Sequence, residues 1–332
     1  MRSLPTIVLM SKDRPEALVR CARRYCEEGL DVVVADGSDH PLPEHARSGA
    51  WRYTHHPRMP YWQRLATTLA SVSSTTCAIA ADDDALLTPA LAEAASLIEH
   101  TPAIVRAAGA VVHACQERPS VDRCFPELLT ERLLDVEETR SLARFERMLR
   151  LGPQVFYCVI RTRVARDVAN LVAALPDDAL VLGEQLWTTL PALAGDYALI
   201  PRLQLVRSIG RPRYEVFLKA MQGVTSLRTA PSFRGVVSGI ETYAREQGLD
   251  AAGASEALRL FDELGWKVTA PSLAARALGW ARYAPRPSLW SDRRERVIFN
   301  GVRARSLARL GSYPWRCEVA RREFMSVLGV IG

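Results

Sequence analysis

The first 115 residues alternate between short apolar segments and amphipathic segments, and this alternation constrains the fold more than any other feature. The apolar segments are typical of buried strands, and the amphipathic ones have helical periodicity and end in turns. Strands that alternate with helices form a mainly parallel sheet with helices on both faces, so we expect an α/β fold. The expected strands are 6–10, 31–35, 51–55, 77–81 and 104–113, and the expected helices are 15–28, 61–72 and 89–99.

The pattern is less regular beyond residue 113. Residues 114–152 are polar and helix-prone, as in an insertion or a lid, and after about residue 210 the sequence is mostly helical. Between these two regions the pattern predicts strands over 154–161, 197–200 and 203–207 and helices over 164–174 and 186–194, the second of which is opened by residues 183–185.

No segment has the pattern of a targeting or membrane-spanning element. The apolar stretch 6–10 is too short for the core of a signal peptide. No apolar run approaches the roughly 20 residues that span a bilayer. The seven cysteines include no CxxC pair, which argues against a zinc site. We therefore expect a cytoplasmic protein.

The net charge of +6 is concentrated near the carboxyl terminus. Residues 282–332 contain eleven arginines and four acidic residues, a net charge of +7. Interleaved apolar residues suit an amphipathic surface helix, which would bring this region into peripheral contact with anionic lipid at the inner face of a membrane. They equally suit a helix that packs on the rest of the protein with its charges in water.

Acidic residues follow two of the expected strands. Residues 82–84 (Asp-Asp-Asp) come directly after strand 77–81, and Asp36-Gly37-Ser38 follows strand 31–35. Parallel sheets bind ligands beyond the carboxyl ends of their strands. Adjacent carboxylates repel one another unless a cation offsets their charge, and Mg²⁺ or Mn²⁺ bridged to a diphosphate would do so. The alternative is that residues 82–84 form an exposed acidic turn that caps the next helix and that Asp36-Gly37-Ser38 forms an ordinary turn.

Three elements, taken in order, resemble the family-2-like bacterial glycosyltransferases, which have the GT-A fold. Residues 7–15 (IVLMSKDRP) resemble their opening strand and Asn-Arg-Pro turn, with Asp13 in place of Asn. Residues 32–38 resemble the second strand, whose last Asp binds the nucleotide base, and residues 80–84 resemble the DXD metal motif. The resemblance is firm over 5–115, thinner to about 210 and absent beyond. It implies a GT-A-like, nucleotide-sugar-binding and catalytic domain over 1–210 and a mostly helical, basic region over 211–332.

The pattern of this family gives each candidate residue an expected role. Glu184 would be the acceptor-side general base if the enzyme inverts the configuration of the sugar, although the family's acidic pair reads Glu184-Gln185 here. The alternative is a first-turn residue stabilised by the helix dipole. Asp84, with Asp82, would hold Mg²⁺ or Mn²⁺. Arg207 is a candidate from its own position, because it lies at the end of a late strand, which suits either binding of the diphosphate or a structural role. The residues expected to bind the nucleotide sugar are Asp36, Ser38, Arg64, Asp82, Asp83 and Arg207.

The histidines depart from the pattern of the family. A histidine in the carboxyl-terminal half often supplies a further metal ligand in GT-A enzymes, but all six histidines here precede residue 114. Either the triplet, phosphates and water hold the metal, or another side chain substitutes. We expect His55 and His56 to form a surface pair.

The expected reaction moves a sugar from a nucleotide-diphosphate sugar, with a UDP-sugar favoured by the resemblance, to an acceptor hydroxyl on a glycan, lipid, peptide or small natural product. A nucleotidyltransferase is an alternative, but it typically needs a glycine-rich loop after its first strand, and residues 10–14 contain no glycine. A noncatalytic nucleic-acid-binding or anionic-surface-binding protein would explain the basic tail but not the acidic strand ends. A single-strand-binding protein would also be expected to carry aromatic-rich basic strands, which this sequence lacks. We therefore expect no nucleic-acid partner.

Overall fold

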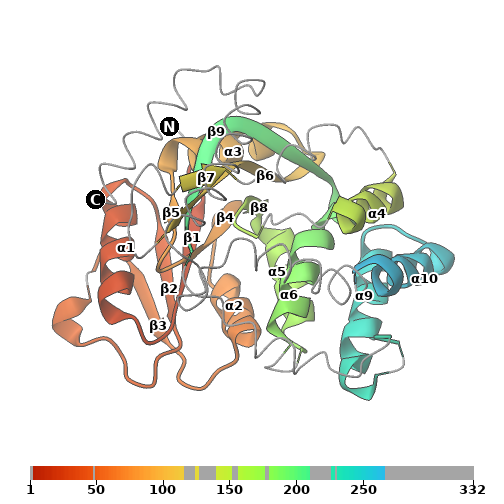
Figure 1. Ribbon diagram of the computed structural model, residues 1–332, viewed down its shortest axis with the longest axis horizontal. Helices are drawn as coiled ribbons and strands as arrows, with labels where there is room; N and C mark the ends of the chain where they lie inside the picture. Colours follow the sequence, from red (N-terminus) through yellow and green to blue (C-terminus); the bar gives the residue numbers. More distant parts are fainter. Residues whose placement is uncertain are drawn as a thin grey trace, which may run out of the picture.

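The computed structural model describes residues 3–47, 49–115, 124–126, 140–151, 156–175, 179–209, 226–228 and 230–265. These residues form a nine-stranded sheet with helices packed against it (Figure 1). The strands are β1 (Thr6–Ser11), β2 (Val32–Asp36), β3 (Arg52–His55), β4 (Thr76–Ala81), β5 (Ala85–Leu86), β6 (Ile104–Cys115), β7 (Cys124–Pro126), β8 (Val159–Arg161) and β9 (Asp196–Ile209).

The sheet has the order β3-β2-β1-β4-β8-β6-β9-β5, with β7 paired to β6. Strands β1 to β4 are parallel to one another. Strand β8 runs antiparallel to both β4 and β6, and β9 is parallel to β6, so β6 and β9 share the direction of β4. Six strands therefore point one way, and the predicted α/β fold with a mainly parallel sheet is confirmed.

Helices cover both faces of the sheet, because side chains alternate along each strand. In β1, Ile7 and Leu9 face a core that is closed by α1 (Pro15–Glu27) and α3 (Thr88–His100). Val8 and Met10 face the other core, which contains the remaining helices. These are α2 (Tyr61–Ala70), α4 (Ser141–Leu151), α5 (Thr162–Val172), α6 (Leu180–Thr189), α7 (Pro191–Ala194), α9 (Arg234–Glu246) and α10 (Ala251–Leu260).

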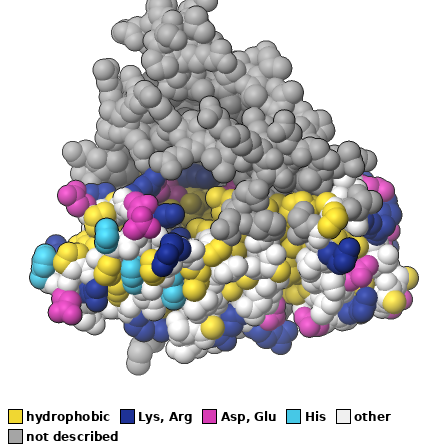
Figure 2. Space-filling model, turned by 90° about the horizontal axis from the view of Figure 1, so that it is seen from below, with side chains coloured by type: hydrophobic (Ala, Val, Ile, Leu, Met, Phe, Trp, Pro, Cys, Tyr) yellow, Lys and Arg dark blue, Asp and Glu magenta, His cyan; other side chains and the backbone are white. Residues whose placement is uncertain are grey.

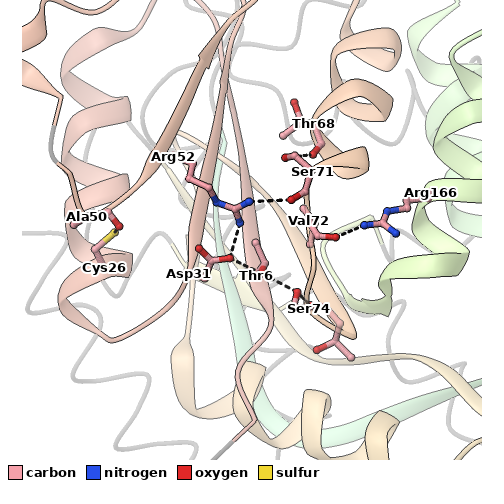
Figure 3. Close-up of polar contacts among 11 residues, drawn as sticks. Thr6, Cys26, Asp31, Ala50, Arg52, Thr68, Ser71, Val72, Ser74 and Arg166 are labelled. Carbon is pink, nitrogen blue, oxygen red and sulfur yellow. Dashed lines mark hydrogen bonds and ion pairs between the residues drawn. The ribbon is translucent and has the colours of Figure 1, made fainter.

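Polar side chains join the amino ends of the parallel strands (Figure 3). Arg52, the first residue of β3, donates to the Ser71 carbonyl at 2.9 Å and to Asp31 Oδ2 at 2.7 Å. The hydroxyl of Thr6, the first residue of β1, donates to the same Asp31 oxygen at 2.8 Å and contacts the Ser74 hydroxyl at 2.7 Å. This edge of the sheet is therefore fixed by hydrogen bonds among its own residues, whereas the candidate site lies at the opposite edge.

Several elements differ from the sequence prediction: β5 and β7 were not expected, β8 is shorter than the strand expected over 154–161, and the helix expected over 186–194 is divided into α6 and α7. Two differences bear on the site. Strand β9 is one continuous strand where two were expected, because it pairs with β6 along its whole length and takes up Pro201 in a register shift between Ala108 and Ala110. Helix α6 begins at Leu180, earlier than expected, because Leu182 and Leu186 both lie in the core. Glu184 is therefore the fifth residue of its helix and not part of an opening turn.

Helices α9 and α10 pack into the same core as α5, to the side of the sheet (Figure 1). Residues 210–225 and 266–332 lie outside the described residues, so the boundary at residue 210 and the role of the basic tail stay predictions. None of the helices in the described part of the chain is long and apolar enough to cross a membrane.

Candidate active site

The eight candidate residues surround the edge of the sheet where the parallel strands end. Asp36 is the last residue of β2, residues 82–84 follow β4, and Arg207 lies near the end of β9. Arg64 and Glu184 come from α2 and α6, which pack against the same face of the sheet. The topology thus brings together side chains that are separated by up to 171 positions in the sequence.

Asp36 organises the turn after β2. Its carboxylate is only 2% exposed and accepts hydrogen bonds from Ser38 N at 2.9 Å, Ser38 Oγ at 2.5 Å and the Tyr53 hydroxyl at 2.7 Å. A carboxylate accepts about four hydrogen bonds, and the described residues supply three of them to Asp36. Ser38 also accepts a bond from the Asp13 amide at 2.8 Å, which links this turn to the loop after β1.

Two histidines after β3 also join this turn. His55 Nε2 lies 2.7 Å from the Ser38 carbonyl, and the His56 amide donates to the Asp36 carbonyl at 2.8 Å. Figure 2 shows histidine side chains gathered on one side of the face in view. Both residues are half-buried and bonded to the turn after β2, so the expected surface pair is only partly exposed. Burial, followed by the charge of Arg64, lowers the pKa of His56.

Arg64 connects the ends of β1 and β2. Its side chain is 4% exposed, and Nη1 donates to the Ser11 carbonyl at 3.0 Å. A Cβ atom at Gly37 would lie 1.3 Å from that nitrogen, so the close approach of the guanidinium requires glycine at position 37. Arg64 Nε is buried and has no hydrogen-bond partner among the residues that the structure describes. The site therefore holds a largely buried cation, one donor of which is unpaired in this part of the chain.

The acidic triplet, Asp82 to Asp84, is divided between two environments. Asp82 accepts from the Ser11 hydroxyl at 2.6 Å, and Arg14 Nη1 bridges Asp82 Oδ1 at 3.1 Å and Asp83 Oδ2 at 2.5 Å. Asp84 instead accepts a hydrogen bond from the Tyr157 hydroxyl. Burial raises the pKa of Asp82, and the Ser11 bond and the Arg14 charge oppose that rise.

Tyr157 and Arg207 connect Asp84 to Glu184. The Arg207 guanidinium lies over the Tyr157 ring, 5.6 Å from its centre. Burial and then the charge of Asp84 raise the pKa of Tyr157, which keeps its hydroxyl protonated as a donor. Arg207 also opposes the rise that burial causes in the pKa of Glu184. Arg207 therefore acts electrostatically on both Tyr157 and Glu184.

Glu184 is a half-buried carboxylate with a raised pKa. Its charge contributes, after burial, to the raised pKa of Tyr61 at the start of α2. A carboxylate of raised pKa is a stronger base than an ordinary glutamate, and general bases in active sites commonly have pKa values shifted in this direction.

Gly183 allows α6 to approach α2. A Cβ atom at this position would lie 2.1 Å from the indole of Trp62, which is itself buried at 4% exposure. We expect Gly183→Ala to lower the free energy of unfolding by about 1–3 kcal/mol, because the buried ring has little room to move. Denaturant unfolding measures this change.

Gly235→Ala is the matched control for that substitution. Its Cβ would meet only Ala174 Cβ, at 3.9 Å, and replacing a helical glycine by alanine stabilises by about 0.5–1 kcal/mol. Equal stability of the two variants would show that α6 does not pack on Trp62 in this way.

Whether a divalent ion fits this site depends on the carboxylate oxygens that residues 82–84 offer as ligands. Carboxylate oxygens suit a hard cation, yet no group of three or more His, Cys, Asp or Glu side chains within the described ranges is placed to hold a metal ion. Mg²⁺ is commonly held by one or two carboxylates together with substrate phosphates. Asp84 and Asp82 therefore fit an ion that binds with a diphosphate, and they do not form a metal cage of their own.

Sequence reasoning missed four residues of the site. Ser11 and Arg14 lie in the loop after the first strand, so their position carried a signal that could have found them. Tyr157 and Tyr61 carried none, because their place in the site depends on the antiparallel strand β8 and on the packing of α2 against α6.

The fold is an α/β fold, and charged and polar side chains gather at the carboxyl ends of its strands. No protein-family model matches the sequence, and a comparison with curated proteins finds no match. Several solved structures have a loosely similar shape. TarS 1–349 from S. aureus in complex with UDP is 12% identical, with a TM-score of 0.48 over 86% of this chain and 76% of that one.

Two further structures complete the comparison. TarS 1–349 in complex with UDP-GlcNAc is 12% identical, with a TM-score of 0.47 over 84% of this chain and 78% of that one. The mannosyltransferase PcManGT from Pyrobaculum calidifontis, in complex with GDP-Man and Mn²⁺, is 13% identical, with a TM-score of 0.39 over 92% and 88%. Likenesses this distant assign neither a family nor a substrate, so the chemistry of the site rests on its own residues.

Proposed function

We propose that this chain is a glycosyltransferase that moves a sugar from a nucleotide-diphosphate sugar, with a UDP-sugar as the favoured donor, to an acceptor hydroxyl. The observation that carries the proposal is the convergence of Asp36, Arg64, Asp84, Arg207 and Glu184 at the carboxyl ends of the strands. This edge is where α/β sheets bind nucleotides. The charge of Arg207 acts on Glu184, and its guanidinium lies over the ring of Tyr157, whose pKa is raised by burial and then by the charge of Asp84, which supports a role for these residues in one site.

In this proposal each residue has one task. Asp36 and Ser38 bind the base or ribose, and Arg64 and Arg207 bind the diphosphate. Asp84, with Asp82, holds a divalent ion, which when bound would neutralise charge on the departing nucleoside diphosphate. Glu184 accepts the proton of the acceptor hydroxyl while that oxygen bonds to the anomeric carbon and the bond from that carbon to the phosphate oxygen breaks.

A screen of nucleotide sugars for slow hydrolysis, with and without Mn²⁺, tests the function. The proposal expects hydrolysis of at least one nucleotide sugar, with a UDP-sugar fastest, and a marked loss of rate without the ion. Stabilisation by an oligonucleotide, with none by any nucleotide sugar, would reject it. Binding of the basic tail to an anionic membrane is a separate proposal, which residues 282–332 carry by their charge alone.

Asp36→Ala should weaken UDP binding by about 1–3 kcal/mol, because a buried donor of the nucleotide would lose its acceptor. Isothermal titration calorimetry with UDP measures this loss. The control is Tyr53→Phe, which removes the 2.7 Å bond to Asp36 and leaves the carboxylate in place. Equal weakening in both variants would make Asp36 a structural residue of the turn, and unchanged binding in both would remove it from the site.

A further inference from the structure

Arg14 supplies a positive charge to the acidic triplet from within the chain. It directly precedes α1, and a single nitrogen, Nη1, bonds one oxygen of Asp82 and one of Asp83. Its side chain is 50% exposed, whereas the Asp82 side chain is only 5% exposed. The guanidinium thus approaches the buried carboxylate of Asp82 and the partly exposed carboxylate of Asp83 from the solvent side.

The other contacts of the acidic triplet show why the bonds from Arg14 matter for the binding of a cation. The other oxygen of Asp82 accepts from Ser11, and Asp84 faces Tyr157. The oxygens that Arg14 bonds are therefore among those that an arriving cation would need. A guanidinium and a divalent ion cannot both take the same carboxylate oxygens, so the two compete.

We propose that Arg14 is a displaceable internal cation: it holds Asp82 and Asp83 in the donor-free protein and transfers to the diphosphate when donor and metal bind together. This inference rests on the proposed function. A guanidinium matches a phosphate group with two parallel hydrogen bonds, so the diphosphate offers it a partner as good as the one it leaves. A half-exposed ion pair contributes little to stability, so its exchange is not costly.

Such an exchange has two consequences. A divalent ion alone binds weakly, because Arg14 occupies two of the carboxylates. Nucleotide and metal then strengthen each other's binding, since the diphosphate draws Arg14 away and also supplies ligands to the ion.

The test is Mn²⁺ binding to the full chain without nucleotide, followed by electron paramagnetic resonance at low ionic strength. Arg14→Gln should bind Mn²⁺ about tenfold more tightly than wild type, because one nearby positive charge is gone. The same variant should bind UDP about tenfold more weakly at saturating Mn²⁺. Arg23→Gln removes an equal charge from an exposed position of the same helix and should match wild type in both measurements.

Arg14→Lys is the second variant, and it keeps the positive charge but lacks the planar guanidinium group. It should leave Mn²⁺ affinity close to that of wild type and weaken UDP binding. Mn²⁺ affinity that is unchanged or lower in Arg14→Gln overturns the inference, whatever the activity. If wild type binds UDP with Mn²⁺ while Arg14→Gln shows unchanged Mn²⁺ affinity, only the role of Arg14 fails. If wild type binds no nucleotide, the proposed function fails instead.

Discussion

Asp84→Asn should reduce sugar transfer about a thousandfold, the largest effect expected of any single substitution in this chain. Asparagine has nearly the shape of aspartate and still accepts the hydrogen bond from Tyr157. It lacks the negative charge with which a carboxylate stabilises a bound divalent ion, so the ion should be held much more weakly. Steady-state transfer with the preferred nucleotide sugar at saturating Mn²⁺ measures the loss, and the melting temperature shows whether the fold is intact.

Asp83→Asn is the control for Asp84→Asn, because it removes the same charge from a neighbouring position of the triplet. The Asp83 side chain is 29% exposed and bonds Arg14, so its loss should cost much less than the loss of Asp84, which is buried at 4% exposure. A larger loss in Asp83→Asn than in Asp84→Asn would assign the metal to the other side of the triplet.

Glu184→Gln should lower kcat at least about a hundredfold and leave UDP affinity nearly unchanged, because a general base acts in the chemical step and not in donor binding. Calorimetry with UDP and steady-state kinetics separate the two quantities. Parallel losses in kcat and UDP affinity would instead give Glu184 a structural role. Wild-type activity should fall as the pH drops through the raised pKa of Glu184.

The same substitution should also change stability in a pH-dependent way. Burial raises the pKa of Glu184 in the folded chain above that of an unfolded glutamate, about 4.3. The protonated carboxyl group is therefore favoured by folding, and that contribution is lost as the pH rises through the folded pKa. Glu184→Gln should then melt at a higher temperature than wild type near pH 8, and the difference should vanish near pH 4. A lower melting temperature for the variant near pH 8 would contradict the burial of this carboxylate.

The first half of the fold follows from the sequence because each strand carries its own signal. Val32 to Ala35 is apolar on both faces, as a central parallel strand requires, and Pro15 and Pro89 mark helix starts. Asp36 and the acidic triplet could be placed at one edge because all parallel strands end on the same side.

The later part of the chain depends on tertiary contacts that the local pattern does not encode. Strand β8 has only three residues, and its antiparallel place between β4 and β6 is set by pairing with distant strands. Tyr157 reaches Asp84 through that pairing. Strand β9 stays continuous through Pro201 because β6 provides a long partner. The bridge from Arg14 to Asp82 and Asp83 depends on side-chain positions across two loops, which periodicity does not report.

Calorimetric titration with UDP, with and without Mn²⁺, tests the central claim of a nucleotide-diphosphate site that binds with a metal. Wild type should bind UDP, and Mn²⁺ should tighten that binding markedly. Asp84→Asn should keep the weaker binding and lose the effect of Mn²⁺. No UDP binding under either condition, or equal binding with and without Mn²⁺ in both proteins, would contradict the claim.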